Sequence, residues 1–194
     1  NRQTFHEQRA PGVPDRESSV HDVLPLAGVI YQPTHDISLY TSYTTSFVPV
    51  LATAVDVNNE NRFTPTKANS IEGGVKANLL DNHAQVTASI FDIRKKGVTN
   101  TFTIGCPTFI GRCTDQVGEE ESKGAEFEVN ARPIEGWQVI FGYAYNDAKV
   151  IQSDDPVTLG KQLTDAPKNS AHLWSRYDFA QGRLSGLGLG LGVS

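Results

Sequence analysis

Apolar and polar residues alternate with a period of two along most of the chain, which predicts β-strands rather than helices. The clearest run covers residues 122–132, where one set of alternate positions is apolar and the other is polar. A strand places two such sets on opposite faces. The apolar set is Ala125, Phe127, Val129 and Ala131, and the polar set is Glu126, Glu128, Asn130 and Arg132.

The same alternation recurs before and after this run. It predicts strands at residues 69–80, 137–150 and 169–179 and near 186–193, with three more at 23–32, 37–47 and 84–98. The run at 84–98 is the least regular, because Ile90 and Phe91 are adjacent large apolar residues. Near the end, Gly188, Gly190 and Gly192 alternate with leucines, which indicates a strand face on which bulky neighbours can pack. A nucleotide-binding glycine fingerprint would open a helix instead.

Short and long connections alternate strictly between these predicted strands. Long loops without structure of their own are uncommon in compact domains. Because the long connections alternate with short ones, all of them are expected at the same end of the strands. Short turns at one end and long loops at the other are typical of outer-membrane barrels. A soluble β-sandwich rarely repeats such unequal loops, and a β-solenoid would show a short internal repeat, which we do not find. The short connections are 33–36, 81–83, 133–136 and 181–183, and the long ones are 48–67, 99–121 and 151–167.

Composition is compatible with a membrane barrel and disfavours other classes. Of the 194 residues, 38% are hydrophobic and 20% are charged, so the chain is neither disordered nor strongly charged. The mean hydropathy is negative, but barrel strands average to amphipathic because lipid-facing and inward residues alternate. No run of about 18 apolar residues offers a membrane-spanning helix. The net charge of −5, without a basic stripe, disfavours nucleic-acid binding.

Both ends of the chain are expected to be internal to a longer protein. The chain begins at Asn1, and it ends at Ser194 inside a patterned segment. Missing targeting signals then carry no information about location. The acidic run Glu119–Glu121 is expected to be a solvated part of a long loop.

Several segments, taken in chain order, carry a family resemblance. They are PLAGVIYQP at 25–33, LYTSYTTSFVP at 39–49, IEGGVKANLL at 71–80, IFDIR at 90–94, SKGAEFEV at 122–129, GW at 136–137, GYAYNDA at 142–148, and Pro167 followed by LWSRYD at 173–178. Together they resemble the barrel of TonB-dependent siderophore receptors and cover most of the chain from Pro25 onward. The chain departs from that family at Leu26, where Arg is common, and at Ile71, where an aromatic residue is more usual. The resemblance therefore does not fix a particular substrate.

The resemblance implies an antiparallel transmembrane barrel of 22 strands closed around an N-terminal plug domain. Residues 1–194 would supply about eight consecutive strands, with the plug, the energy-coupling box and the last strand outside this chain. The implied protein lies in the outer membrane of a Gram-negative bacterium and imports ferric siderophores as cargo. It has no enzymatic activity and no resident cofactor, contacts the TonB energy-transducing protein through the plug region, and borders lipid and lipopolysaccharide. The alternatives are a receptor for cobalamin, haem or a saccharide, a passive porin, an adhesive surface barrel, or a soluble all-β binding module.

Candidate site residues fall into three groups, and no catalytic signature or metal-ligand spacing accompanies them. An inward-facing charge ladder comprises Glu72, Lys76, Glu126, Glu128 and Arg132. Cys106 and Cys113 lie in one long loop, where a surface disulfide would persist and would pin the loop. Aromatic faces and Arg donors suit chelates with planar or anionic groups. The resulting ligand-contact candidates are Phe63, Phe102, Phe109, Arg112, His172 and Trp174.

Overall fold

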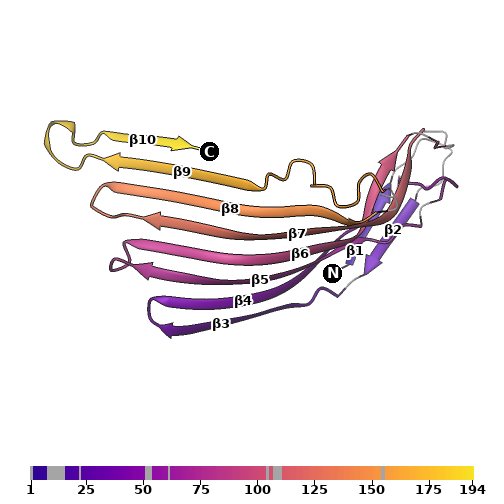
Figure 1. The fold of residues 1–194 in the computed structure, drawn as a ribbon, viewed down its shortest axis with the longest axis horizontal. Helices are drawn as coiled ribbons and strands as arrows, with labels where there is room; N and C mark the ends of the chain where they lie inside the picture. The colour runs from indigo at the N-terminus through magenta and orange to yellow at the C-terminus, as the bar shows by residue number, and fades with distance from the viewer. Residues whose placement is uncertain are drawn as a thin grey trace.

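The computed structural model describes residues 2–7, 16–21, 23–50, 54–60, 62–103, 105–106, 111–153 and 156–194. In this part of the chain, the main body is an antiparallel sheet of eight strands in which each strand pairs with its neighbours in sequence (Figure 1). Its strands are β3 (Leu26–Thr34), β4 (Ile37–Val48), β5 (Thr66–Leu79), β6 (Ala84–Phe102), β7 (Cys113–Ala131), β8 (Trp137–Gln152), β9 (Asn169–Asp178) and β10 (Gly188–Val193). A separate antiparallel pair comprises β1 (Arg2–Glu7) and β2 (Arg16–His21).

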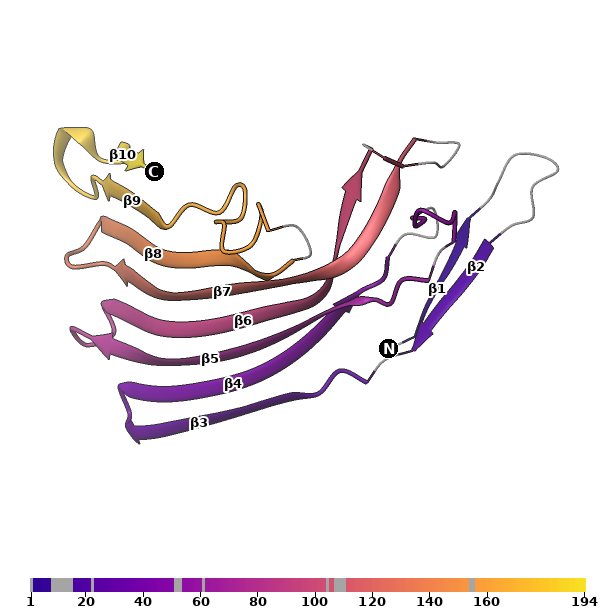
Figure 2. The ribbon, with the colours of Figure 1, turned by 45° about the vertical axis from the view of Figure 1, so that its right-hand side comes forward.

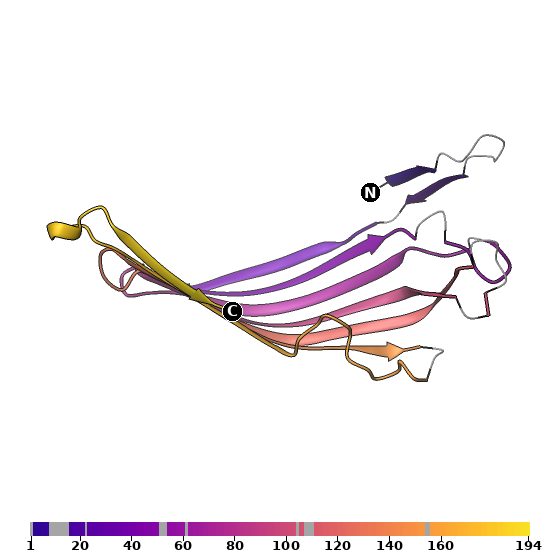
Figure 3. The same ribbon diagram turned by 90° about the horizontal axis from the view of Figure 1, so that it is seen from above.

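The eight-stranded sheet is curved and open, with β3 and β10 as its edges (Figure 3). Each edge leaves a row of backbone N–H and C=O groups without a sheet partner. A curved meander with two open edges is the shape of a segment cut from a barrel wall. The predicted all-β antiparallel fold and the order of its strands are therefore confirmed. Within the described ranges, no helix has the length and the apolar composition needed to span a membrane.

Cross-strand register collects large apolar side chains on one face of this sheet. Ala88 of β6, Phe127 of β7 and Tyr143 of β8 lie opposite one another in a single row. Ile90 is 68% exposed, Phe127 39% and Leu191 79%, so no second layer of described residues covers this face. The buried apolar residues in the described ranges are few and mostly small: Val55, Ala84, Cys113, Ala131 and Ala148. The apolar face is therefore not the core of a sandwich.

Strand β6 is more regular than its sequence suggests. Ile90 lies opposite Ala125 on the apolar face, whereas Phe91 lies opposite Gly124 on the polar face. Ile90 and Phe91 therefore point to opposite faces, as in a regular strand. The polar face accommodates the ring of Phe91 because the residue opposite it on β7 is a glycine.

Short turns join the strands at one end of the sheet, and the longer connections lie at the other (Figure 1). The turn after β5 has positive φ at Leu80, Asp81 and Asn82, and the turn after β7 has φ +80° at Gly136. The β9–β10 connection is longer than predicted and contains a 3-10 turn, η1 (Gly182–Leu184). We refer below to the short-turn end and the long-loop end of the sheet.

The predicted long loop at 99–121, with its solvated acidic run, is wrong in extent. Strand β6 continues to Phe102, and β7 already begins at Cys113, so both project beyond their neighbours (Figure 2). At the base of this extension, where β6 still pairs with β5 and β7 still pairs with β8, opposite charges hold the two strands together, since cross-strand ion pairs contribute to pairing without any apolar alternation. The pairs are Arg94–Glu121 at 3.0 Å, Lys95–Glu120 at 3.3 Å and Lys96–Glu119 at 3.4 Å.

Candidate functional site: the polar wall and the long-loop end

Four members of the predicted charge ladder lie within strands on the polar face, and the fifth, Arg132, directly follows the end of β7. Lys76 lies in one register row with Glu128 and His172, and Glu126 lies in the adjacent row, while Glu72 lies one row further along β5. All five ladder residues lie in the described ranges, and no ion pair within 4 Å joins any two of them. Their charges therefore face the space beside the polar face of the sheet, which we call the polar wall.

Tyr40 connects two ladder residues on β5. Its hydroxyl donates a hydrogen bond to Glu72 Oε1 at 2.6 Å. Lys76 Nζ lies 5.4 Å from the centroid of the same ring, which is a cation–π distance. The ring thereby holds a carboxylate and an ammonium group at fixed positions on the wall.

Large side chains of the polar face lie against glycines of the neighbouring strand. A Cβ atom on Gly74 would meet Tyr40 at 2.7 Å, and one on Gly124 would meet Phe91 at 2.6 Å. His172 lies against Gly142 in the same way, and Trp174 lies against both Gly190 and Gly192. Because these glycines have no side chain, the rings lie along the sheet instead of projecting from it. The aromatic rings of the polar face therefore project little into the space in front of its charged side chains.

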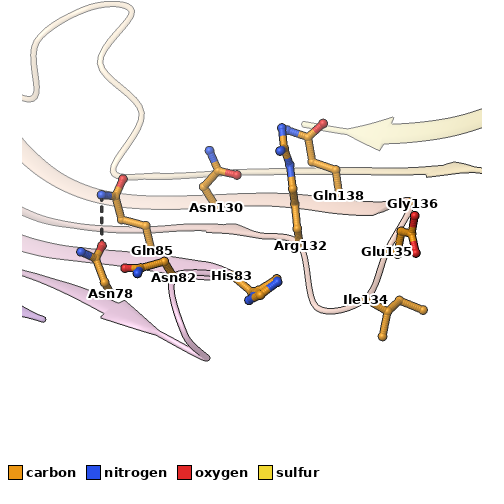
Figure 4. Close-up of a pocket in the computed structure, with 10 residues that line it drawn as sticks. All are labelled: Asn78, Asn82, His83, Gln85, Asn130, Arg132, Ile134, Glu135, Gly136 and Gln138. Carbon is orange, nitrogen blue, oxygen red and sulfur yellow. Dashed lines mark hydrogen bonds between the residues drawn. The ribbon is translucent and has the colours of Figure 1, made fainter.

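His172 and Trp174 consequently belong to the wall and not to the loops. His172 lines a shallow pocket of about 210 Å³ together with Glu126, Glu128 and Ser170. Arg132 lies at the short-turn end instead, in a wider pocket of about 790 Å³ with polar side chains that include Asn78, Gln85, Asn130 and Gln138. In this pocket Gln85, Asn130, Arg132 and Gln138 point to one side of the sheet, and Ile134 points to the other (Figure 4).

At the long-loop end, a disulfide joins Cys106 to Cys113, with the two Cα atoms 5.5 Å apart. Cys113 is completely buried and pairs in register with Phe102, the last residue of β6. The bond closes the tip of the β6–β7 hairpin, and Arg112 is exposed at the same tip. Phe102 and Arg112 thus lie at the same end of the hairpin, whereas Phe109 lies outside the described residues.

Phe63 lies in the connection between β4 and β5, whose described residues 54–60 and 62–65 we call the β4–β5 loop. This loop is attached to the hairpin, because the Thr114 N–H donates to the Val55 carbonyl at 2.7 Å. The half-buried Phe63 is therefore near the hairpin, while His172 and Trp174 remain on β9. The five candidate contacts that lie in the described ranges therefore do not form one cluster.

Gln116 makes the most extensive side-chain attachment of this loop, and sequence reasoning missed it. Its Oε1 accepts from the Thr64 N–H at 2.8 Å and from the Thr64 hydroxyl at 3.3 Å. Its Nε2 donates to the Thr64 carbonyl and, at 2.8 Å, to the Gly97 carbonyl. No local motif signals such a contact, because Gln116 and Thr64 are 52 positions apart.

A short acidic turn orders the other part of the β4–β5 loop. Asp56 Oδ1 accepts from the Asn58 N–H at 2.8 Å and from the Glu60 N–H at 2.9 Å. These bonds stabilise the ionised carboxylate, and the backbone hydrogen bond from Glu60 does most to hold the pKa of Asp56 below its usual value.

Charged residues mark the limit of the apolar face toward the long-loop end. Lys123 and Asp147 occupy the positions next after Ala125 and Tyr145 on that face. Lys123 Nζ is 2.9 Å from Glu121 and 3.5 Å from Asp92, and Lys149 Nζ is 3.2 Å from Asp147. In the described ranges, no group of three His, Cys, Asp or Glu side chains could hold a metal ion.

Comparisons with known proteins agree with this architecture. A family model described as "TonB dependent receptor-like, beta-barrel" matches residues 1–194. The chain is 32% identical over 169 residues to the probable TonB-dependent siderophore receptor PiuA of Acinetobacter baumannii, covering 78% of this chain and 22% of that protein. It is 32% identical over 173 residues to the ferrioxamine B receptor of Salmonella typhimurium, covering 89% and 23%.

Solved structures show the same fold. The ferripyoverdine receptor of the outer membrane of Pseudomonas aeruginosa, bound to ferripyoverdine, has a TM-score of 0.74 at 24% identity and covers 92% of this chain and 23% of that one. The ferric-catecholate import receptor Fiu from E. coli K12 has a TM-score of 0.69 at 27% identity, covering 86% and 24%. The chain thus spans less than a quarter of the length of these relatives. With the family model matched over its whole length, the chain belongs to the TonB-dependent receptor-like β-barrel family.

Proposed function

We propose that this chain forms part of the wall of an outer-membrane receptor that imports ferric siderophores by energy-coupled transport. The observation that carries the proposal is the uncovered apolar face of a curved antiparallel sheet, opposite a polar wall that bears charges. Relatives named as receptors for ferrioxamine B and ferrichrome support the choice of cargo.

The two faces suit a membrane on one side and an aqueous interior on the other. Lipid offers backbone groups no hydrogen-bond partner, so spanning strands must be paired in a closed barrel. The apolar stretches of β5 and β8 are about nine residues long, close to what a tilted spanning strand needs. The short turns then lie in the periplasm and the long loops at the cell surface, in a Gram-negative outer membrane.

Each surface of the wall has its own partner in this proposal. The apolar face contacts lipid and lipopolysaccharide, the polar wall faces a plug domain supplied by the rest of the receptor, and the surface loops contact the ferric siderophore. The TonB energy-transducing protein acts through the plug region. The chain performs binding and transport without a resident cofactor and without enzymatic chemistry.

Uptake of labelled iron by cells tests this function. The intact receptor is expressed in a Gram-negative strain lacking its own siderophore receptors, and 55Fe-loaded ferrioxamine B, ferrichrome and ferripyoverdine are supplied in parallel. We expect saturable uptake of at least one chelate, abolished in a strain without TonB. Uptake that is unsaturable and independent of TonB would instead show a passive porin, and absence of uptake for all three would remove the proposed cargo class.

A further inference from the structure

The Gln116 carboxamide pairs with Thr64 as a neighbouring strand would. It accepts from the Thr64 N–H and donates to the Thr64 carbonyl, so both backbone groups of one residue are satisfied by one side chain. This double exchange is the pattern of a hydrogen-bonded residue pair in an antiparallel sheet. The β4–β5 loop is thereby attached to β7 without forming a strand.

The same carboxamide also reaches β6. Its Nε2 donates to the carbonyl of Gly97, which also accepts from the Thr66 hydroxyl at 2.8 Å. Gly97 has φ +67° and lies at an irregularity in the β6–β7 register. A Cβ atom there would meet Gln116 Nε2 at 3.3 Å, so a side chain at this position would be strained and would press on the carboxamide. Gln116 therefore connects the loop to both strands of the hairpin.

We propose that Gln116 is a positioning residue that fixes the β4–β5 loop, and Phe63 within it, on the disulfide-closed hairpin, and thereby sets the affinity of the receptor for its ferric siderophore. This inference rests on the proposed function, since the loop lies at the end where the cargo would enter. Thr114, which holds Val55, directly follows the disulfide residue Cys113, so the loop and the hairpin tip form one connected unit. A loop ordered before the ligand arrives does not lose that conformational freedom on binding, which increases affinity.

The residue type is specific, because the site needs an acceptor and two donors in one planar group. Gln116→Glu keeps the size of the side chain and the acceptor for the Thr64 N–H, but it replaces the donor with an oxygen that faces two carbonyl groups. Gln116→Ala removes every bond. Gln162→Glu is the matched control: it introduces the same charge at the long-loop end, and its own bond, to the Ala166 carbonyl, lies within the β8–β9 connection.

The first measurement needs no ligand. Hydrogen exchange of the intact, detergent-purified receptor should show protection of the Thr64 amide falling roughly tenfold or more in Gln116→Ala, since the loss of a few hydrogen bonds is on this scale. Protection should also fall in Gln116→Glu, because repulsion from the two carbonyl groups moves the carboxylate away from Thr64. Gln162→Glu should leave that amide unchanged. Unaltered protection at Thr64 in both Gln116 variants would overturn the inference whether or not a siderophore has been identified.

The second measurement is uptake of 55Fe-loaded ferrioxamine B, ferrichrome and ferripyoverdine. For any of the three that the parent receptor transports, we expect the KM for uptake to rise about tenfold in the Gln116 variants with Vmax unchanged. A general folding defect would lower Vmax through loss of receptor from the membrane, which immunoblotting of outer membranes detects. An unchanged KM would refute the role of Gln116 in affinity. If the parent receptor transports none of the three chelates, the proposed cargo is refuted. The positioning of the loop by Gln116 is then tested by hydrogen exchange alone.

Discussion

The indole ring of Trp174 lies against Gly192 of the adjacent strand, at a position where a Cβ atom on Gly192 would meet the ring at 2.8 Å. The two residues are direct cross-strand partners, and a Cβ atom on Gly190 would likewise meet the ring at 2.8 Å. Tyr40 with Gly74 and Phe91 with Gly124 repeat the arrangement. Glycine on one strand and a ring on the next thus keep bulky residues along the polar face of the sheet.

Gly192→Ala should displace the ring of Trp174 from the wall. Added volume in a close contact typically costs about 1–3 kcal/mol, and we expect the lower end because a ring can swing toward the interior. The fluorescence of Trp174, taken as the difference between receptors with and without Trp174→Phe, reports the displacement, and denaturant unfolding in lipid vesicles reports the stability. Gly28→Ala is the control, since its nearest neighbour would be at an ordinary 3.5 Å. An unshifted emission spectrum in Gly192→Ala would contradict the packing described.

A charge on the apolar face should be far more damaging than the same charge one residue earlier. Ala88 lies opposite Phe127 on the apolar face, and Thr87 lies opposite Glu128 on the polar face. Ala88→Lys should lower the free energy of unfolding by about 2–4 kcal/mol, the cost of Lys at the lipid face near the bilayer midplane. Thr87→Lys should have a much smaller effect. Equal losses for the two variants in lipid vesicles would argue against a lipid-facing apolar surface.

Removal of the disulfide should loosen the hairpin tip and leave the sheet intact. The bond closes a loop between residues seven positions apart, for which the chain-entropy model gives about 2.5 kcal/mol of stabilisation. In Cys106→Ser/Cys113→Ser, limited digestion of the receptor in membranes with trypsin should cut after the exposed Arg112 at a concentration of protease that spares the parent. The circular dichroism of the strands should be unchanged. Equal resistance in both proteins would show that the bond does not order the tip.

Order in the β4–β5 loop should depend on pH through Asp56. The folded-state pKa of this carboxyl is below its unfolded value. Its stabilising contribution is therefore fully present above the unfolded pKa, about 4, and is lost as the pH falls through the folded-state pKa. Exchange of the Asn58 and Glu60 amides, normalised to intrinsic rates, should accelerate in that acidic range. Asp56→Asn cannot ionise, so a similar pH dependence in that variant would assign the effect to another group.

Much of the wall could be predicted from the sequence, because an exposed two-faced strand must alternate and the alternation is visible in one dimension. The polar face of β7, which carries Glu126 and Glu128, and its apolar face, which carries Phe127, follow from spacing alone. The pairing of the charged segment Glu119–Glu121 of β7 with β6 could not be predicted in this way. Glu119–Glu121 show no alternation, and their strand conformation depends on the cations of β6 that lie opposite them.

The sequence by itself determined the class of the fold, the two faces of each strand and the placement of short and long connections, because these depend on neighbours a few residues apart. Only the tertiary structure decided the register, and with it the ring–glycine pairs, the separation of His172 and Trp174 from the loop candidates, and the attachment of Thr64 to Gln116. Those contacts join residues far apart in the chain, so strand pairing has to bring them together before their chemistry can act.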